Sequence, residues 1–307
     1  MQRRDFLKST LAGPAILGRL KGTEAIARRK FRDDVTLSVI GFGGIVVVGL
    51  EQPEADRTVA RSIERGINYF DVAPTYGKGE AETKLGNALK PYRKDVFLAC
   101  KTTKRDADGA RQELESSLRQ LHTDYFDLYQ FHAVSSMEDV EKITGPGGAA
   151  ELFVKAQKEG KVRYIGFSAH SAEAAVALMD RMELASALFP VNFVCFAQGN
   201  FGPQIIAKAK EKGVARLALK AMALTRVKKG QPRPYKKCWY VPVDQREKAE
   251  RALRFTLSQE ITAAIPPGDE RLYEMALELA AGFRPMNEDE QRTLLAEAKG
   301  LEPIFRA

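Results

Sequence analysis

Short apolar runs alternate with amphipathic stretches along the chain from about residue 35 onward. Eight of these runs show little alternation between apolar and polar positions, which is typical of parallel strands that are buried on both faces. They predict strands at Leu37–Gly41, Tyr69–Asp71, Val96–Lys101, Phe126–His132, Tyr164–Ser168, Val191–Phe196, Ala215–Lys220 and Ile261–Pro266.

The stretches between the strands carry apolar residues three and four positions apart, which is the spacing of one helix face. In the stretch 107–121, for example, Leu114, Leu118 and Leu121 share one side. A last stretch, 286–300, predicts a C-terminal helix that starts at an Asn287 cap. The other helices are predicted at 54–66, 80–90, 107–121, 149–160, 172–182, 203–212, 245–258 and 269–281.

Eight successive strand–helix units predict an α/β fold, a (β/α)8 TIM barrel with an extra C-terminal helix, because such barrels fill about 250 residues as one domain. An open doubly wound sheet would show a similar alternation, but usually with fewer strands and with a G-x-G-x-x-G turn after the first. Gly41, Gly43 and Gly44 only approach that turn. We therefore expect one barrel domain over residues 31–307.

Two adjacent arginines and a short apolar run open the chain, in MQRRDFLKSTLAGPAILG. The pattern resembles a twin-arginine export signal, and Ala25–Ala27 offers a cleavage site. Charged residues interrupt the run before that site, which leaves a flexible basic extension as the alternative. Residues 1–30 are assigned to one of these two. The protein is expected to be periplasmic or exported if the signal is used, and cytoplasmic otherwise.

Composition argues against several classes of protein. The net charge of +8 comes from residues 1–32 and 212–243, which hold nine Lys or Arg each, so the rest of the chain is net acidic. A nucleic-acid binder more often spreads its charge over one face with base-reading elements among it, so no nucleic-acid partner is expected. No run reaches about 18 apolar residues, so no integral membrane span is expected. Three scattered cysteines and three histidines predict no metal site.

Four polar residues stand at or just behind the ends of consecutive predicted strands. Asp71 ends the second strand and Tyr76 follows it in the loop, while Lys101 and His132 end the third and fourth. TIM barrels hold their chemistry at the carboxyl ends of the strands, so these side chains are expected to meet. Each alone has a structural explanation, such as a cap or a solvated lysine, but the combination favours catalysis.

The four residue types suit the reduction of a carbonyl group. A phenol has a pKa near 10, and a nearby ammonium lowers it by favouring the phenolate. We expect Lys101 to act in this way on Tyr76, with Asp71 holding the lysine. His132 can donate a hydrogen bond to the substrate oxygen, on which negative charge develops as hydride reaches the carbonyl carbon.

The sequence resembles the aldo-keto reductases from about residue 35 to 280. DVAPTYGKGEAETKLGNALK is similar to the segment with the family's catalytic Asp and Tyr, VFLACKT to the one with its Lys, and LRQLHTDYFDLYQFH to the one with its His. The resemblance implies that Tyr76 is the general acid, tuned by Asp71 and Lys101, and that His132 orients the carbonyl. The implied reaction reduces an aldehyde or ketone to an alcohol. NADP is the implied cofactor, and NAD is possible.

The resemblance also implies residues that bind this cofactor. KEGKVRYIGFS is similar to the fifth-strand signature, in which Ser168 would hold the nicotinamide carboxamide, and Gln198 matches the family's glutamine on the same amide. Lys220 lies in the basic stretch that we expect to face the pyrophosphate, because barrels often bind phosphate after strands seven and eight. The remaining predicted residues are Gly43, and Arg271 and Glu274 at the adenosine end.

The sequence departs from the family at three places. Ala169 stands where a second carboxamide ligand, an Asn, is usual, and IPPGDERLYEM lacks the Lys-Ser pair and the Asn expected near the 2′-phosphate. No aromatic clearly matches the residue that stacks on nicotinamide. Phe193, Phe196 and Phe201 are candidates, and Trp239 and Tyr240 would instead shape the opening to substrate.

Two other functions stay open at this point. A nicotinamide-binding sensor or regulatory protein with little turnover would share the fold, and the altered cofactor contacts are compatible with it. An unrelated barrel, such as a sugar-phosphate isomerase or lyase, would need Lys101 for a Schiff base. The substrate and the oligomeric state are not predicted.

Overall fold

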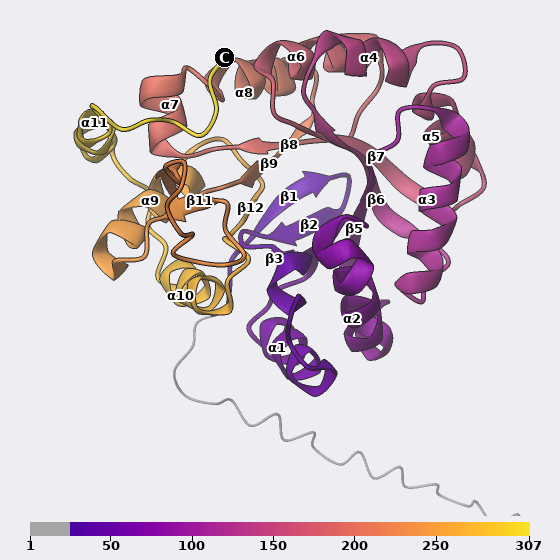
Figure 1. Ribbon diagram of the computed structural model, residues 1–307, viewed down its shortest axis with the longest axis horizontal. Coiled ribbons are helices and arrows are strands. Elements are labelled where there is room, and N and C mark those ends of the chain that lie inside the picture. The colour runs from indigo at the N-terminus through magenta and orange to yellow at the C-terminus, as the bar shows by residue number, and fades with distance from the viewer. Residues whose placement is uncertain (1–24) are drawn as a thin grey trace, which may run out of the picture.

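A closed barrel of eight parallel strands forms the centre of the computed structural model, which describes residues 25–307 (Figure 1). A parallel bridge between Ile40 and Ala264 joins the two edges of the sheet. In hydrogen-bonded order the strands are β12 (Ala263–Ile265), β9 (Ala215–Leu219), β8 (Ser186–Pro190), β7 (Val162–Ala169), β6 (Phe126–Val134), β5 (Phe97–Thr102), β4 (Tyr69–Asp71) and β3 (Phe42–Gly43).

Helices surround the barrel and bury their apolar sides (Figure 1). The helix after β5, for example, buries Leu114 and Leu118 and leaves Arg111 and Arg119 exposed. The prediction of a (β/α)8 barrel is confirmed. The eight main helices are α1 (Gln52–Glu64), α2 (Glu80–Leu89), α3 (Ala107–Gln120), α5 (Ala149–Lys158), α6 (Ala172–Arg181), α8 (Pro203–Glu211), α9 (Arg246–Ser258) and α10 (Glu270–Ala281).

An antiparallel hairpin of β1 (Arg28–Arg32) and β2 (Val35–Ser38) covers the amino-terminal end of the barrel. Its Phe31 packs edge-on against Phe97, the first residue of β5, with ring centroids 5.1 Å apart. The predicted first strand, Leu37–Gly41, was therefore misplaced, because it overlaps the hairpin and stops before β3. Strand β1 begins inside the stretch 1–30 that was assigned to a signal or extension, and the twin-arginine pattern itself lies outside the described residues.

The sixth barrel strand was predicted at Val191–Phe196, and this prediction was wrong. The strand is β8, and Phe193–Gly199 forms the short helix α7. Two apolar runs adjoin here, and an apolar run alone does not distinguish a buried strand from a buried helix. The signal that separates them is Asn192, whose side chain accepts a hydrogen bond from the Cys195 backbone N–H and caps α7.

The remaining elements are peripheral. The loop after β9 forms a second hairpin from β10 (Ala223–Arg226) and β11 (Tyr240–Pro242), and α4 (Met137–Thr144) follows β6. The expected C-terminal helix is α11 (Glu288–Glu297), which begins with a capping box between Asn287 and Glu290. Among residues 25–307, no helix is long and apolar enough to cross a membrane.

The three cysteines, Cys100, Cys195 and Cys238, are all free thiols and all buried. Burial raises the pKa of each of them. Cys100 lies in β5, Cys195 in α7 and Cys238 in the loop between β10 and β11.

Candidate active site

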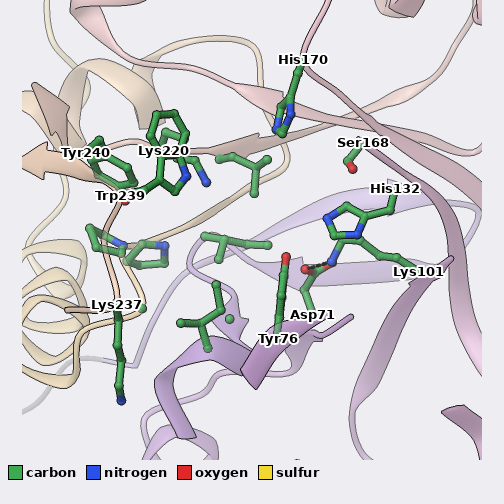
Figure 2. Close-up of a pocket in the computed structure, with 17 residues that line it drawn as sticks. Asp71, Tyr76, Lys101, His132, Ser168, His170, Lys220, Lys237, Trp239 and Tyr240 are labelled. Carbon is green, nitrogen blue, oxygen red and sulfur yellow. Dashed lines mark hydrogen bonds and ion pairs between the residues drawn. The ribbon is translucent and has the colours of Figure 1, made fainter. Parts of the chain in front are cut away.

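A cavity of about 230 Å³ opens at the carboxyl ends of the barrel strands (Figure 2). Its walls come from strands that are far apart in the sequence, and the loop after β9 forms one side of it. The structure brings together seven of the residues that the sequence predicted for the site, namely Gly43, Asp71, Tyr76, Lys101, His132, Ser168 and Lys220.

A buried ion pair between Lys101 and Asp71 forms the floor of this cavity. The Lys101 ammonium donates to the Asp71 carboxylate and, at 3.1 Å, to the Val72 carbonyl oxygen. The two side chains are only 1% and 2% exposed. Buried charges are tolerated where each is paired and hydrogen-bonded, so the pair holds the lysine charged without help from water.

Two residues that the sequence did not single out donate further hydrogen bonds to the Asp71 carboxylate. Gln130 donates to its Oδ2 at 2.9 Å, and the Tyr69 hydroxyl donates to the same oxygen at 3.3 Å. Tyr69 precedes Asp71 by two residues, as Gln130 precedes His132, and residues two apart on a strand point to the same face. That spacing is the signal by which both residues were detectable.

Burial and the charge of Lys101 shift the pKa of Tyr76 in opposite directions. Burial raises the pKa of Tyr76 and the Lys101 ammonium lowers it, and the balance lies above the ordinary value. From the sequence we expected Lys101 to lower the pKa of Tyr76. Burial outweighs the lysine, so the pKa is raised instead. The Lys101 ammonium lies 5.2 Å from the centre of the Tyr76 ring. Tyr76 therefore carries its proton at neutral pH, as a proton donor must.

Lys101 itself is not set up as a nucleophile. Burial alone would lower the pKa of its ammonium, but Asp71 and Tyr76 outweigh burial and raise it above the ordinary value. A Schiff base requires an uncharged amine, which enzymes obtain by lowering the lysine pKa. The structure thus argues against the isomerase or lyase alternative.

His132 stands opposite Tyr76, with ring centroids 5.9 Å apart and the rings nearly perpendicular. Burial and then the positive charge of Lys101 lower its pKa to about 2, with smaller effects from His170, Arg105 and Lys220. The imidazole is therefore neutral. Its Nδ1 is buried and has no hydrogen-bond partner among the described residues.

Lys220 and two aromatic residues form the wall across from the ion pair (Figure 2). The Lys220 ammonium lies 5.7 Å from the Trp239 ring centre and 5.6 Å from that of Tyr240. Burial lowers its pKa to about 8. It has no carboxylate partner among residues 25–307. Burial and Lys220 together lower the pKa of His170, on the same wall, to about 4.

Two further predicted cofactor residues line the cavity as expected. Ser168 is buried, and its hydroxyl oxygen accepts a hydrogen bond from the Ala133 backbone N–H at 2.7 Å, so the hydroxyl proton is left to donate. Gly43 ends β3 beside β12, where a Cβ would come within 2.9 Å of the Ile265 side chain. Only glycine allows this close approach.

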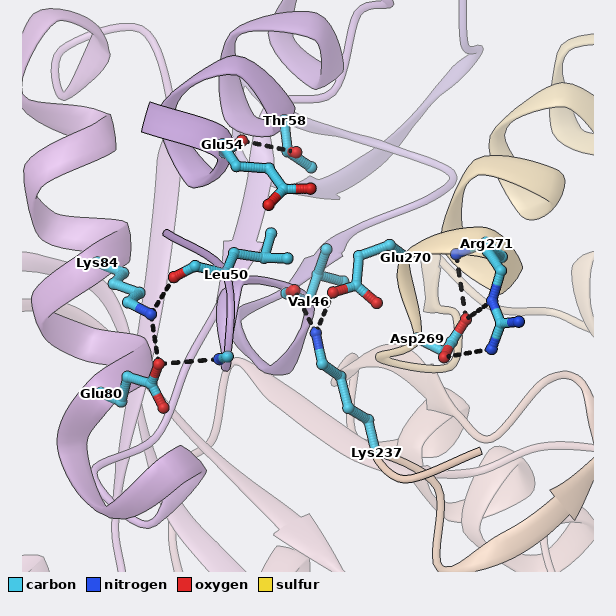
Figure 3. Close-up of polar contacts among 11 residues, drawn as sticks. Val46, Leu50, Glu54, Thr58, Glu80, Lys84, Lys237, Asp269, Glu270 and Arg271 are labelled. Carbon is cyan, nitrogen blue, oxygen red and sulfur yellow. Dashed lines mark hydrogen bonds and ion pairs between the residues drawn. The ribbon is translucent and has the colours of Figure 1, made fainter. Parts of the chain in front are cut away.

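Three predicted cofactor residues lie outside the cavity lining. Gln198 sits in α7, where its amide contacts the Ala197 carbonyl oxygen at 3.4 Å. Glu274 pairs with Arg65 at 2.9 Å on the outer side of α10. Arg271 pairs with Asp269 near the start of α10 and keeps a largely exposed side chain (Figure 3). Their roles stay predictions.

The aromatic wall is made by Trp239 and Tyr240 and not by the phenylalanines that the sequence offered for stacking. Phe193 and Phe201 are buried, and Phe196 packs edge-on against Phe255 at 5.3 Å. All three belong to the packing of α7 and its neighbours, which follows from the corrected position of the sixth strand.

Lys237, in the basic stretch 212–243, ties the loop after β9 to the opposite rim of the cavity. Lys237 donates to the Val46 carbonyl oxygen at 2.9 Å and pairs with Glu270 at the start of α10 (Figure 3). This contact joins the loop after β9 to the loop after β3 across the rim of the cavity. Lys237, unlike Lys220, already has its counter-charge.

A TIM barrel with Asp, Tyr, Lys and His at one strand-end cavity defines a small class of proteins, and comparison with known proteins identifies it. The model of the aldo/keto reductase family matches residues 39–283, and the chain belongs to that family. The aldo-keto reductase YhdN of Bacillus subtilis is 34% identical over 151 residues, which cover 45% of this chain and 44% of that protein. The chain thus spans about half the length of the curated relatives it matches.

Solved structures show the same fold. The holo form of an aldo-keto reductase from Bacillus halodurans has a TM-score of 0.71 at 22% identity, covering 91% of this chain and 98% of that one. An aldo-keto reductase from Klebsiella pneumoniae in complex with NADPH has a TM-score of 0.69 at 19% identity, covering 93% and 98%. At these identities the likeness concerns the fold.

The low pKa of His132 makes a prediction about pH. The folded protein keeps this imidazole neutral, whereas the unfolded chain protonates it below pH of about 6.5. His132 therefore reduces the free energy of unfolding progressively as the pH falls below that value. In ¹⁵N NMR spectra, the His132 ring should show no protonation between about pH 8 and pH 4. The variant His132→Gln assigns the resonance and should lose less stability on acidification. A His132 midpoint between pH 5 and 7 would contradict the prediction.

Proposed function

We propose that this protein catalyses the NAD(P)H-dependent reduction of an aldehyde or ketone to an alcohol, with Tyr76 as the general acid. The observation that carries the proposal is the meeting of Tyr76, Lys101 and His132 in one cavity over Asp71. Family membership supports it. The tetrad supports turnover over a purely sensory role, because binding alone needs no proton donor.

The residues divide the work around the carbonyl oxygen. The oxygen lies between the Tyr76 hydroxyl and the His132 imidazole, and the neutral imidazole donates a hydrogen bond to it without adding charge. As negative charge grows on this oxygen, Tyr76 transfers its proton to it. The Lys101 ammonium stabilises the phenolate that remains, and Asp71 keeps that ammonium charged and in position.

Two side chains in the cavity suit the binding of a nicotinamide dinucleotide. The Ser168 hydroxyl has a proton to donate to a carboxamide oxygen. Lys220 has no carboxylate partner among residues 25–307, so a pyrophosphate would supply its counter-charge. When bound, the reduced nicotinamide supplies the hydride for the carbonyl carbon. We favour NADP over NAD because the Klebsiella pneumoniae relative was solved with NADPH, and because the Arg271 guanidinium, although paired with Asp269, keeps an exposed side that a phosphate can reach.

Replacing Tyr76 by Phe tests the acid. The variant Tyr76→Phe should lose turnover by about a hundredfold or more, since proton transfer by a positioned group contributes about 10²–10⁴. Its affinity for the cofactor should stay within about threefold of that of the original protein. The matched control is Tyr125→Phe, a hydroxyl removed from an exposed ring far from the cavity. Unchanged turnover in Tyr76→Phe would remove Tyr76 from the mechanism.

Fluorescence titration tests the cofactor. Trp239 is the single tryptophan and lines the cavity, so a nicotinamide bound there should quench its emission. We expect saturable binding of NADPH at micromolar concentration or below, with NADH weaker. Adenosine without nicotinamide serves as the control for quenching. If neither dinucleotide binds, the proposed reductase activity fails with its cofactor.

We also propose that the segment ahead of β1, which carries the twin-arginine pattern predicted for residues 1–30, directs export through the twin-arginine pathway. Support comes from the sequence alone, in which Arg3 and Arg4 precede a short apolar run. That pathway moves folded proteins, which suits an enzyme that takes up its cofactor before export. In a bacterial host the protein should reach the periplasm, and a variant with both arginines replaced by lysine should stay in the cytosol. Unprocessed protein found only in the cytosol would contradict the proposal.

A further inference from the structure

A bulge interrupts β6 at the catalytic histidine. Along the ladder between β6 and β7, Phe131 pairs with Phe167 and Val134 pairs with Ala169, so β6 uses one more residue than β7 over this interval. Ala133, the residue after His132, has a φ of 54°, in the left-handed region that a residue with a Cβ rarely adopts. Bulges of this kind redirect side chains next to active sites.

A bulge leaves backbone groups without their ladder partners, and buried backbone groups need others. The Ala133 N–H donates to Ser168, and the Val134 carbonyl oxygen accepts from the His170 N–H at 2.9 Å. The two remaining carbonyl groups belong to His132 and Ala133. A single side chain from another loop, that of Arg105, serves both of them.

Arg105 reaches the bulge from the loop after β5, the strand that carries Lys101. Its Nη2 donates to the His132 carbonyl oxygen at 2.8 Å and to the Ala133 carbonyl oxygen at 3.3 Å. Its Nε donates to Asp139 at 2.8 Å, and that pair is only 17% and 20% exposed. Asp139 is itself fixed by the Ser135 N–H at 2.8 Å. Arg105 is thus held at both ends.

The His132 ring depends on this backbone for its position. Its Nδ1 makes no hydrogen bond to a described residue, so no side-chain partner fixes the imidazole through that nitrogen. We propose that Arg105 is a positioning residue, which clamps the bulge of β6 and thereby sets the His132 imidazole opposite Tyr76. It touches neither the cavity nor the reacting atoms. The effect on turnover rests on the proposed reductase function, whereas the effect on the position of His132 does not.

Kinetics of single and double variants test the effect on turnover. Arg105→Ala should lower kcat about tenfold or more and change the affinity for the cofactor less than threefold. Arg105→Lys should restore part of kcat, because an ammonium donates to carbonyl oxygens but lacks the guanidinium geometry that reaches both these carbonyl groups and Asp139. The control is Arg246→Ala, which removes an exposed ion pair with Glu278 and should keep kcat within twofold.

The same substitution in a His132→Gln background separates positioning from general stability. If Arg105 acts through His132, adding Arg105→Ala to His132→Gln should lower kcat by less than a further twofold. An equal fall in both backgrounds would overturn the proposal, because it would show a role that does not pass through His132. An unchanged kcat in Arg105→Ala would overturn it as well.

A spectroscopic measurement decides the question without turnover. The chain has three histidines, and His122 lies exposed after α3, away from the bulge. In ¹⁵N NMR spectra, Arg105→Ala, or Arg105→Lys if the first variant does not fold, should shift the His132 ring resonances and leave those of His122 in place. Unmoved His132 resonances would overturn the proposal. If no carbonyl is reduced but His132 moves, the proposed function fails and the positioning role stands.

Discussion

Two backbone hydrogen bonds, each of 2.9 Å, close the barrel: the Gly41 N–H donates to Ala264, and the Ala264 N–H donates to Val39. Because the sheet closes, the carboxyl ends of all its strands meet at one mouth, and side chains from β4, β5, β6 and β7 point into one volume. At this seam the size of one residue also matters for the approach of the next strand, β4. A Cβ on Gly41 would lie 2.5 Å from the Tyr69 ring, so glycine lets the first strand come near enough to its neighbour.

The described residues neutralise the positive charge on one side of the cavity and not on the other. On one side Lys101 is neutralised by Asp71, which two further side chains saturate, so that half is complete in the protein alone. On the other side Lys220 lies among aromatic rings and a histidine, and no carboxylate in the described part of the chain pairs with it. A cation that is partly withdrawn from water and lacks a counter-charge is costly. This asymmetry makes the second side the place where an anionic ligand group gains most.

Much of this arrangement was readable in the sequence. The helices follow a period of 3.6 residues over ten or more positions, and the predicted helices all occur close to their expected bounds. The four residues at the strand ends also converge, since a parallel barrel brings those ends together. The sixth strand was misplaced because an apolar run such as VNFVCF is consistent with a strand or a buried helix, and the assignment of Gln198 relied on that position.

Other features depend on contacts that no sequence pattern contains. The pKa of Tyr76 reflects the balance between its burial and the nearby Lys101 ammonium. Neither the degree of burial nor the distance to the ammonium can be read from the sequence. Arg105 is far from His132 in sequence, and its side chain serves backbone carbonyl groups, which carry no residue identity. A side chain that binds backbone carbonyl groups in this way can be recognised only once the bulge in β6 is known.

The buried cysteines have a consequence for how the protein meets its surroundings. Thiol chemistry requires the thiolate, and each of the three sulfur atoms is both enclosed and held in its protonated form. Burial therefore disfavours oxidation and disulfide exchange at these three thiols in the folded chain.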